Sequence, residues 1–379
     1  MEKEEKYNRI VLIGNGFDKA LGLKTSYLDF IIHFLKESII NAINNIKSDL
    51  LPLELKTHLS SGQIAYYTSS TPDIKTIKEL STTINNLFSV NYYEFLNEII
   101  EHYSSANWVD IEQHYYKSLK TYYQRFKNNV YSTEVPDTVI ELNKCMDLLS
   151  IEVSKYINEQ QNKYFIDSLD TPLATLFDNF RNPLHQKRSN LVKRHQRKDS
   201  PENVLFLNFN YTNTVQQILK NEFWSGVNHH HIHIHGNVNY NSNPIIFGYG
   251  DDTGDIYKQL ETEGENEWLR IIKSFQYPRT HNYHNLLNFL YKADFDVFIV
   301  GHSCGLSDKT LLKTIFEHDK CLAIQNFHYK GEEEDFNKRM QISRHFSDKA
   351  LMRQRVLPFD RNAIIPQVKS VLKPIDSVN

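Results

Sequence analysis

Short apolar runs of the kind that form buried β-strands are distributed unevenly along this chain of 379 residues. One run lies near the start, at residues 10–13. From residue 51 to about residue 178 such runs are almost absent, and long stretches with apolar residues at helical spacing take their place. Further strand-like stretches follow Pro201, with helical patterns between several of them, at residues 204–207, 232–235, 245–247, 297–300 and 321–324. Strands that alternate with helices predict an α/β fold with a parallel sheet.

The same distribution predicts how the chain is divided. We expect residues 1–45 and 200–379 to form a core around a parallel sheet of about six strands. Residues 46–199 would form a large helical insertion over one end of this sheet. The first strand, 10–13, would then pair across the insertion with the strands that begin near residues 204 and 297.

The insertion ends in a basic stretch. Residues 181–198 contain seven Lys or Arg and no acidic residue. Such a stretch is most often a solvated loop, and contact with nucleic acid is the alternative. No aromatic residue interleaves the basic ones, which disfavours stacking on bases.

Charge and composition exclude several classes of protein. The net charge of −3 gives no global field that would attract nucleic acid or an anionic membrane. No apolar run approaches the ~20 residues that span a bilayer. The three cysteines, Cys145, Cys304 and Cys321, are widely spaced, which disfavours disulfides and zinc knuckles and fits a reducing compartment. The charged start of the chain lacks the apolar segment of a signal peptide, so we expect a globular cytoplasmic protein.

A glycine turn follows the first predicted strand directly. Gly14, Asn15 and Gly16 lead from that strand into a helical pattern. Glycines permit a tight turn, and the free N–H groups at a helix start can bind a phosphate. An ordinary turn is the alternative. Lys19 stands at the third glycine position of the dinucleotide pattern, and helix follows where a second strand ending in an acid is expected. An ordinary nicotinamide dehydrogenase is therefore disfavoured.

Polar residues also follow two later strands. Asn208, Asn210, Tyr211 and Thr212 end the run that begins at 204, and residues at the carboxyl ends of parallel strands line the ligand crevice. Capping of turns is the alternative role for the two asparagines. The run that begins at Val297 ends at Gly301, where a turn would present Ser303 to a ligand and Ser307 or Asp308 would cap the next helix.

A row of histidines precedes another glycine. In a strand, His231, His233 and His235 would share one face, with Ile232 and Ile234 on the other. Alternate strand positions lie ~6.5–7 Å apart, which is awkward for chelation of one ion, so we expect no metal. His235, at the strand end beside Gly236, is the best candidate for chemistry.

Together these stretches resemble the AbiH family of bacterial abortive-infection proteins. The residues that carry the resemblance are IGNGFDKALGLKTSY at 13–27, NWVDIE at 107–112, NFNYTNT at 208–214, HIHGN at 233–237, IIFGYGDD at 245–252 and VGHSCGLSD at 300–308. They span nearly the whole chain in the right order.

More distantly, the same order resembles the sirtuin-like NAD-binding fold of several phage-defence NAD hydrolases. This resemblance implies a Rossmann-like (sirtuin- or DHS-like) core, with Asn210 and His235 as the catalytic pair. It also implies contacts with the nucleotide from Gly14, Asn15, Gly16, Phe17, Asp18, Tyr211, Gly301, Ser303 and Asp308. Two residues depart from the sirtuin pattern: Thr212 replaces an aspartate, and Asp18 stands where many sirtuins have a serine.

The resulting hypothesis is an antiviral effector that hydrolyses NAD⁺ to ADP-ribose and nicotinamide. Asn210 would position water, and His235 would polarise the ribose. Asp18 would repel a phosphate, so it is expected to cap a helix or to accept a ribose hydroxyl. We expect no cofactor beyond NAD⁺ as the substrate, and activation by a phage-derived trigger. A homo-oligomer and a partner subunit both remain open.

Two other functions stay open at this stage. One is a non-catalytic sensor that binds NAD or ADP-ribose, and the other is a nucleic-acid-directed effector. A nuclease would need clustered acids, for which Asp251, Asp252 and Asp255 are candidates, although their glycine-rich setting favours a turn. Trp108, Asp110 and Glu112 are expected to be a buried aromatic with two exposed acids; the alternative is that Asp110 or Glu112 reaches over the cleft to the ribose.

Overall fold

A computed structural model describes residues 7–69, 76–102, 108–128, 135–183, 200–220, 228–239, 242–250 and 254–375. The basic residues 184–198 and two of the three candidate acids, Asp251 and Asp252, lie outside these ranges.

Five parallel strands form the central sheet, in the order β6-β5-β1-β7-β8. They are β1 (Tyr7–Ile13), β5 (Asn203–Asn208), β6 (His229–His233), β7 (Asp294–Val300) and β8 (Cys321–Phe327). The predicted parallel sheet is therefore confirmed, and so is the pairing of the first strand, because Ile13 lies opposite both Asn208 and Val300. Numbered by their order along the chain, these strands lie in the order 3-2-1-4-5. The direction of winding reverses between β1 and β7, and ligands bind at such a point in open α/β sheets.

The prediction of about six strands was wrong for one run. Residues 245–247 form no strand, although Ile246 and Phe247 are buried as the apolar pattern suggested. Tyr249, two residues after Phe247, makes an isolated β-bridge to Ile272. A short buried apolar run does not distinguish a strand from a buried loop.

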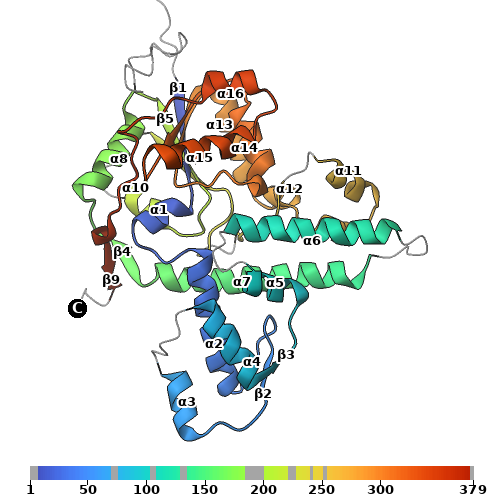
Figure 1. The fold of residues 1–379 in the computed structure, drawn as a ribbon. Helices are drawn as coiled ribbons and strands as arrows, with labels where there is room; N and C mark the ends of the chain where they lie inside the picture. The colour runs from blue at the N-terminus through green and yellow to red at the C-terminus, as the bar shows by residue number, and fades with distance from the viewer. Residues whose placement is uncertain are drawn as a thin grey trace, which may run out of the picture.

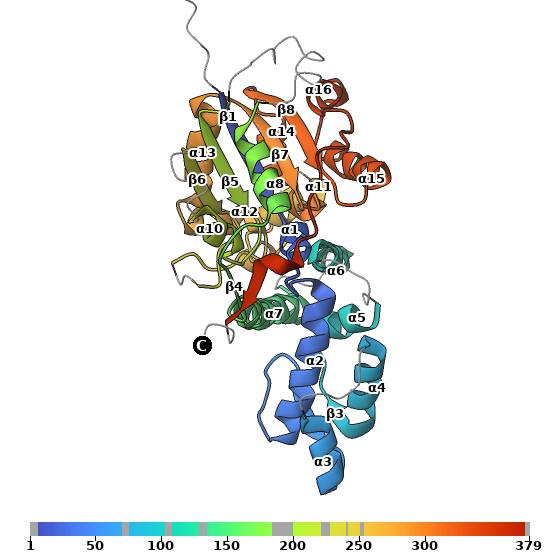
Figure 2. The same cartoon turned by 90° about the vertical axis from the view of Figure 1, so that its left-hand side faces the viewer.

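Helices cover both faces of the sheet (Figure 2). On one face, Phe177 and Phe180 of α8 (Thr171–Arg181) pack against Phe206 and Phe298, together with residues of α1 (Asn15–Ala20) and α10 (Thr214–Leu219). On the other face lie α13 (Asn282–Lys292) and α14 (Lys309–Phe316). Alternate residues of β1, β5 and β7 join alternate clusters, as the two-residue period of a strand requires.

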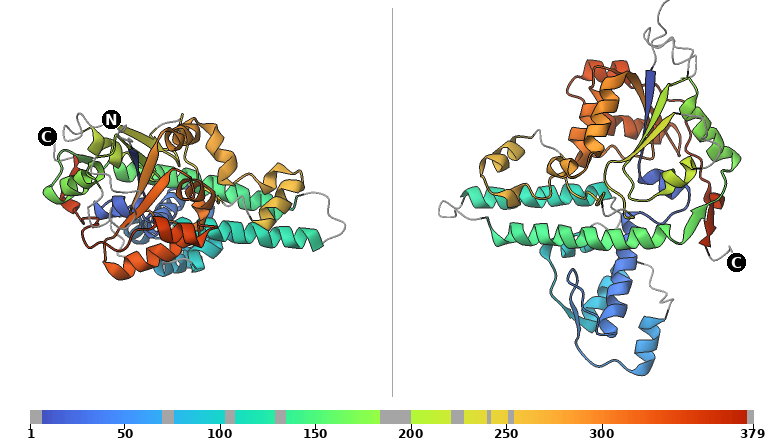
Figure 3. Two further views of the ribbon diagram at one scale, coloured as in Figure 1. Left: turned by 90° about the horizontal axis from the view of Figure 1, so that it is seen from above. Right: turned by 180° about the vertical axis from the view of Figure 1, so that it is seen from behind.

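Two further helices, α15 (Glu332–Ser343) and α16 (Lys349–Arg355), pack beside β8, and most of the others lie beyond the carboxyl edge of the sheet (Figure 1). Two long helices, α6 (Trp108–Asn128) and α7 (Asp137–Gln161), run side by side there (Figure 3). Their common apolar cluster includes residues of α2 (Tyr27–Ile43), α4 (Ile77–Leu87), α5 (Glu94–His102) and the segment around Trp268. This region also contains helix α3 (Ser61–Thr68) and two short ladders. One ladder pairs β2 (Leu53–Leu55) with β3 (Phe88–Val90), and the other pairs β4 (Tyr164–Ile166) with β9 (Leu372–Pro374). Because α2 packs into the same cluster, the division of the chain at residue 45 stays a prediction.

A buried ion pair ties α8 to the sheet. The guanidinium of Arg9 in β1 donates to both oxygens of Asp296 in β7, at 2.7 Å each. Its third nitrogen donates to three carbonyls at the end of α8, those of Asn179, Phe180 and Asn182, at 3.1, 3.0 and 2.7 Å. The Arg9 side chain therefore pairs with the charge of Asp296 and also donates hydrogen bonds to carbonyls at the end of α8 that have no partner within the helix.

Candidate functional site

Two glycine turns pack backbone to backbone where the winding reverses. The Gly14 N–H donates to Val300 O at 3.1 Å, and the Gly16 N–H donates to Gly301 O at 2.9 Å. A Cβ atom on Gly14 would lie 2.4 Å from His302 Cα, and one on Gly301, whose φ is +72°, would lie 2.3 Å from the Phe17 nitrogen. The glycines are thus required by the close approach of the turns. A phosphate could bind the N–H groups of Gly14 and Gly16 only after the turns separate.

This packing leaves no room for a side chain at Gly16, so a substitution there is expected to disturb the fold itself as well as any bound ligand. A Cβ atom on Gly16 would lie 2.8 Å from Gly301 O and 2.9 Å from Gly301 Cα. Even Gly16→Ala is therefore expected to lower the free energy of unfolding by about 1–3 kcal/mol through overpacking. Urea denaturation measures this change. Gly62→Ala is the matched control, since Gly62 has open space around it in α3 and should lose no stability. Equal stability of Gly16→Ala and the wild type would contradict the packing described.

Asn15 connects the first turn to the helical part. Its Nδ2 donates to Thr25 O at 3.1 Å, and its Oδ1 accepts from the Thr25 hydroxyl at 2.5 Å. The Trp108 indole donates to the same carbonyl at 3.0 Å and packs against Tyr27 and Phe247. Asn15 and Trp108 thus hold the chain between α1 and α2 against α6.

Asp18 and Asn210 lie in a buried polar group beyond the carboxyl ends of β1 and β5. Asp18 Oδ2 accepts from the Thr212 hydroxyl at 2.7 Å, and Thr214 bonds Thr212 at 3.1 Å. The Asn210 amide donates to Gly14 O at 3.1 Å. Burial raises the pKa of Asp18 to about 6. Since the folded-state pKa is raised, the protonated form favours folding, and this stabilisation is lost as the pH rises from about 4 through 6.

Five titratable side chains meet beside this group, from widely separated parts of the chain. We call them the buried centre: Glu112, His235, Lys273, His302 and Asp308. The Lys273 ammonium lies 2.8 Å from Asp308 Oδ1 and 2.9 Å from Glu112 Oε1. His235 Nε2 lies 3.1 Å from the same Asp308 oxygen, and His302 Nε2 lies 3.5 Å from Asp308 Oδ2. Phe209 contacts the rings of both histidines.

The charges of the buried centre depend strongly on one another. Burial opposes ionisation of Asp308, but Lys273 and then His235 outweigh it and hold the pKa of Asp308 well below its ordinary value. Burial likewise opposes the charge of Lys273, yet Asp308 and Glu112 raise its pKa. Burial raises the pKa of Glu112, and Lys273 offsets only part of this effect. Burial, assisted by Lys273, lowers the pKa of His235 to about 4, so His235 is neutral at pH 7 and able to accept a proton.

The histidine row divides at the end of β6 (His229–His233). The rings of His231 and His233 lie 4.4 Å apart, on one side of the strand as predicted. His233 Nδ1 bonds Asn210 O at 3.1 Å, and its Nε2 accepts from Asn237 at 2.9 Å. His235 lies past the strand end and joins the buried centre instead. Asn210 and His235 lie in two neighbouring buried groups, and their action as a catalytic pair on one ribose stays a prediction.

The other predicted residues differ in their burial and in their hydrogen-bond partners. The Tyr211 hydroxyl donates to Ile246 O at 3.2 Å, and Phe17 is buried in the core. Ser303 is exposed, whereas Ser307 is fully buried. Asp308 begins α14 without a side-chain capping bond, because its carboxylate pairs with Lys273 instead.

The expectation of a buried Trp108 with two exposed acids was wrong, because Trp108 and Asp110 are half-buried and Glu112 is buried. Glu112 reaches the buried centre from α6 and also accepts the Gly248 N–H at 3.2 Å. The alternative that Asp110 or Glu112 reaches a ribose stays a prediction. Asp255 is exposed at the start of α11 (Asp255–Thr262).

Two members of the centre escaped the sequence analysis. Lys273 stands among apolar residues in LRIIKSF, and an isolated lysine in such a run was the only signal. His302 follows Gly301 directly at a strand end, a position that did signal a ligand edge. The turn after β7, which contains His302, is strained at Cys304, whose φ is +54°. Non-glycine residues rarely adopt this conformation, and such strain is typical of functional sites.

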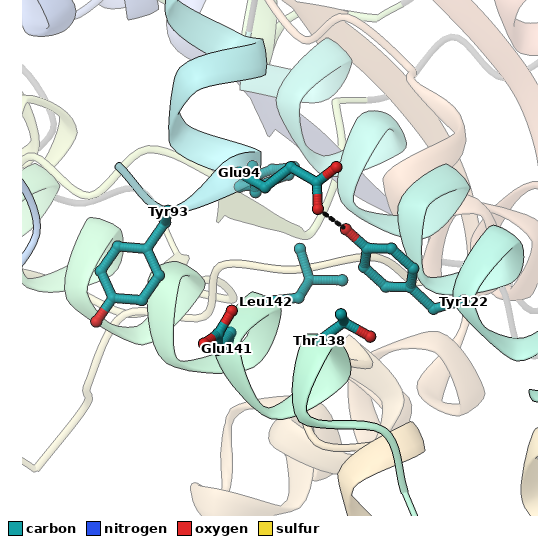
Figure 4. A pocket seen from close by; sticks show the side chains of 7 residues that line it. Tyr93, Glu94, Tyr122, Thr138, Glu141 and Leu142 are labelled. Atoms are coloured by element: carbon teal, nitrogen blue, oxygen red, sulfur yellow. Dashed lines mark hydrogen bonds between the residues drawn. The ribbon is translucent and has the colours of Figure 1, made fainter. Parts of the chain in front are cut away.

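A small cavity lies elsewhere, between α5, α6 and α7 (Figure 4). Its volume is about 20 Å³, room for little more than one water molecule. Glu94 accepts a hydrogen bond from Tyr122 at 3.1 Å beside it. Its lining shares no residue with the buried centre and consists of Tyr93, Glu94, Phe95, Tyr122, Thr138, Glu141 and Leu142.

Comparison with known protein families gives a match over most of the chain. The family model described as bacteriophage abortive infection AbiH matches residues 10–329. This range includes every residue of the buried centre. A search of curated proteins finds no match to the chain. In the part of the chain that the structure describes, no helix combines the length and the apolar character that a membrane span requires.

Proposed function

Since this chain belongs to the AbiH family, whose members are described as bacteriophage abortive-infection proteins, we propose that it is a defence effector that hydrolyses NAD⁺. Family membership itself indicates the role in abortive infection. The reaction and its substrate are our proposal. The observation that supports them best is a neutral, buried His235 that lies 3.1 Å from an ionised Asp308, at the carboxyl edge of a parallel sheet.

The proposed reaction breaks the bond between the ribose C1 atom and the nicotinamide nitrogen. Water forms the new bond to C1, a proton is released, and the products are ADP-ribose and nicotinamide. Nicotinamide leaves without protonation, so the site must stabilise positive charge on the ribose and orient the water. His235 would polarise a ribose hydroxyl with Asp308 behind it, and Asn210 would orient the water through its amide.

The polar groups around Gly14 support binding of the rest of the nucleotide. The carboxylate of Asp18 is buried and has one oxygen without a hydrogen-bond partner among the described residues, which suits a ribose hydroxyl. The proposed contacts of Gly14, Asn15, Gly16, Gly301 and Ser303 with phosphate require the two glycine turns to separate. We therefore propose that the two glycine turns are in contact in the resting molecule and that binding of the nucleotide separates them.

The decisive experiment incubates the purified protein with NAD⁺ and measures free nicotinamide by chromatography. The assay is run with the protein alone and with lysate of phage-infected cells, because the trigger is unknown. We expect nicotinamide and ADP-ribose in equal amounts in at least one condition. Binding of NAD⁺ by calorimetry without nicotinamide release in either condition would favour the sensor alternative. Neither binding nor release would show that NAD⁺ is not the ligand.

A further inference from the structure

Lys273 joins the helical part of the molecule to the edge of the sheet. It begins α12 (Lys273–Gln276), and its ammonium lies between Glu112 of α6 and Asp308 of the turn after β7. All three side chains are buried, with Lys273 only 1% exposed. An ammonium between two carboxylates that water does not reach is a strong and specific tie, because removal of any one partner leaves an unpaired buried charge.

The same tie fixes a cover segment, which we define as residues 246–250 and 254–277. The Gly248 N–H donates to Glu112 Oε1 at 3.2 Å, and the Lys273 N–H donates to Tyr249 O at 2.9 Å. Gly250 O accepts from the Thr310 N–H at 3.0 Å. Trp268 packs against Tyr123 of α6, with ring centroids 5.3 Å apart. The cover segment therefore lies between α6 and the sheet edge and closes the buried centre.

Lys273 and His235 both approach one oxygen atom of Asp308. Asp308 Oδ1 lies 2.8 Å from Lys273 Nζ and 3.1 Å from His235 Nε2. The lysine makes a hydrogen bond there, whereas His235 Nε2 has no contact with hydrogen-bond geometry among the described residues. The Tyr277 hydroxyl, in the cover segment, is also buried without a partner in the described part of the chain. Buried polar atoms rarely remain unpaired, so another arrangement of these groups is favoured once Lys273 moves.

We propose that Lys273 is a positioning residue that holds the buried centre closed in the resting protein, and that the centre becomes active when the cover segment moves and His235 takes the Asp308 oxygen. This inference rests on the proposed function, because it concerns the same His235–Asp308 pair. An effector whose action harms its own cell needs a resting state. Here the tie between Glu112, Lys273 and Asp308 supplies that state, and a trigger would act by drawing the cover segment away from the sheet edge.

Lys273→Met tests the tie without any reference to catalysis. The methionine keeps the length of the side chain and removes its charge. Amide hydrogen exchange, measured by mass spectrometry, should become about 10²-fold faster or more at the backbone amides of Gly248, Tyr249 and position 273. The reason is that the carboxylates of Glu112 and Asp308 lose the ammonium that pairs with them in the closed state. Amides of β1 and β7 serve as the internal control and should change little. Lys313→Met is the matched control variant, since Lys313 is 35% exposed in its pair with Glu317.

Glu112→Gln provides a second variant in case Lys273→Met does not fold. It keeps the shape of the side chain and an oxygen for the Gly248 N–H, but it removes the negative charge that pairs with Lys273. We expect an intermediate rise in exchange, and in both variants more nicotinamide release without infected-cell lysate than the wild type gives. Unchanged exchange in both variants would overturn the inference. Faster exchange with less nicotinamide release than the wild type would also overturn it, because Lys273 would then serve the active state. Faster exchange with no release from any protein, wild type included, would support the closing role of Lys273 and reject the proposed hydrolysis.

Discussion

His235→Ala is expected to lower nicotinamide release by about 10²–10⁴-fold, the usual loss when one general base is removed. The imidazole is the group proposed to polarise the ribose, and an alanine cannot take its place beside Asp308. Asn210→Ala should cause a loss of similar size, because the water would no longer be oriented. The melting temperature of each variant, recorded beside its rate, separates lost chemistry from lost folding.

His231→Ala is the matched control for these two variants. His231 lies in the same histidine row but outside the buried centre, where its Nε2 lies 3.4 Å from the Asn208 amide. Its rate should stay within a few-fold of the wild type. If His235→Ala retained full nicotinamide release and full protection against phage, the catalytic role of His235 would be wrong. If His231→Ala, His233→Ala and His235→Ala all lost activity equally and added zinc restored it, the row would be a metal site instead.

Asp296→Ala is expected to lower the free energy of unfolding by about 3–5 kcal/mol, because it leaves the guanidinium of Arg9 buried and without its carboxylate. Arg9 has no exposed surface and donates twice to Asp296, so water cannot replace the lost partner. Urea denaturation, followed by circular dichroism, measures the change. The expected loss is a large share of the 5–15 kcal/mol that stabilises a typical protein.

Two variants serve as controls for this measurement. Glu152→Ala breaks the pair with Lys155, whose side chain is 66% exposed, and should cost less than ~1 kcal/mol. The double variant Arg9→Met, Asp296→Leu removes both buried charges and should recover much of the lost stability. A loss in Asp296→Ala no larger than that of Glu152→Ala would contradict the view that this ion pair matters to the fold.

The sequence predicted most of the sheet well because β1, β5, β7 and β8 are buried on both faces. Such strands appear as continuous apolar runs, and the run at 10–13 marked the central strand β1 correctly. The run at 245–247 failed for the same reason, since burial alone produced its apolar pattern. The pairing of β1 followed from the parallel arrangement and needed no local signal.

The buried centre was less predictable because its contacts join residues far apart in the sequence. His235 was found from its place beside a glycine at a strand end, and Asp308 from its place at a helix start. The role of Lys273 depends on Glu112 and Asp308, which lie on other elements, so no local pattern reveals it. The glycine turn was predicted as a turn, but its contact with Gly301 needs the fold, because only the sheet brings β1 and β7 together.

The central position of β1 has a consequence for synthesis on the ribosome. Arg9 and Asp296 are separated by 287 positions, so the first strand made must wait for most of the chain before it gains its second neighbour. Contacts of such long range form slowly, and an unpaired apolar strand is prone to aggregate until they form. The nascent chain is therefore expected to need chaperone protection for longer than a protein whose neighbouring strands follow one another. The same delay means that a chain that ends before Asp308 cannot contain the assembled buried centre.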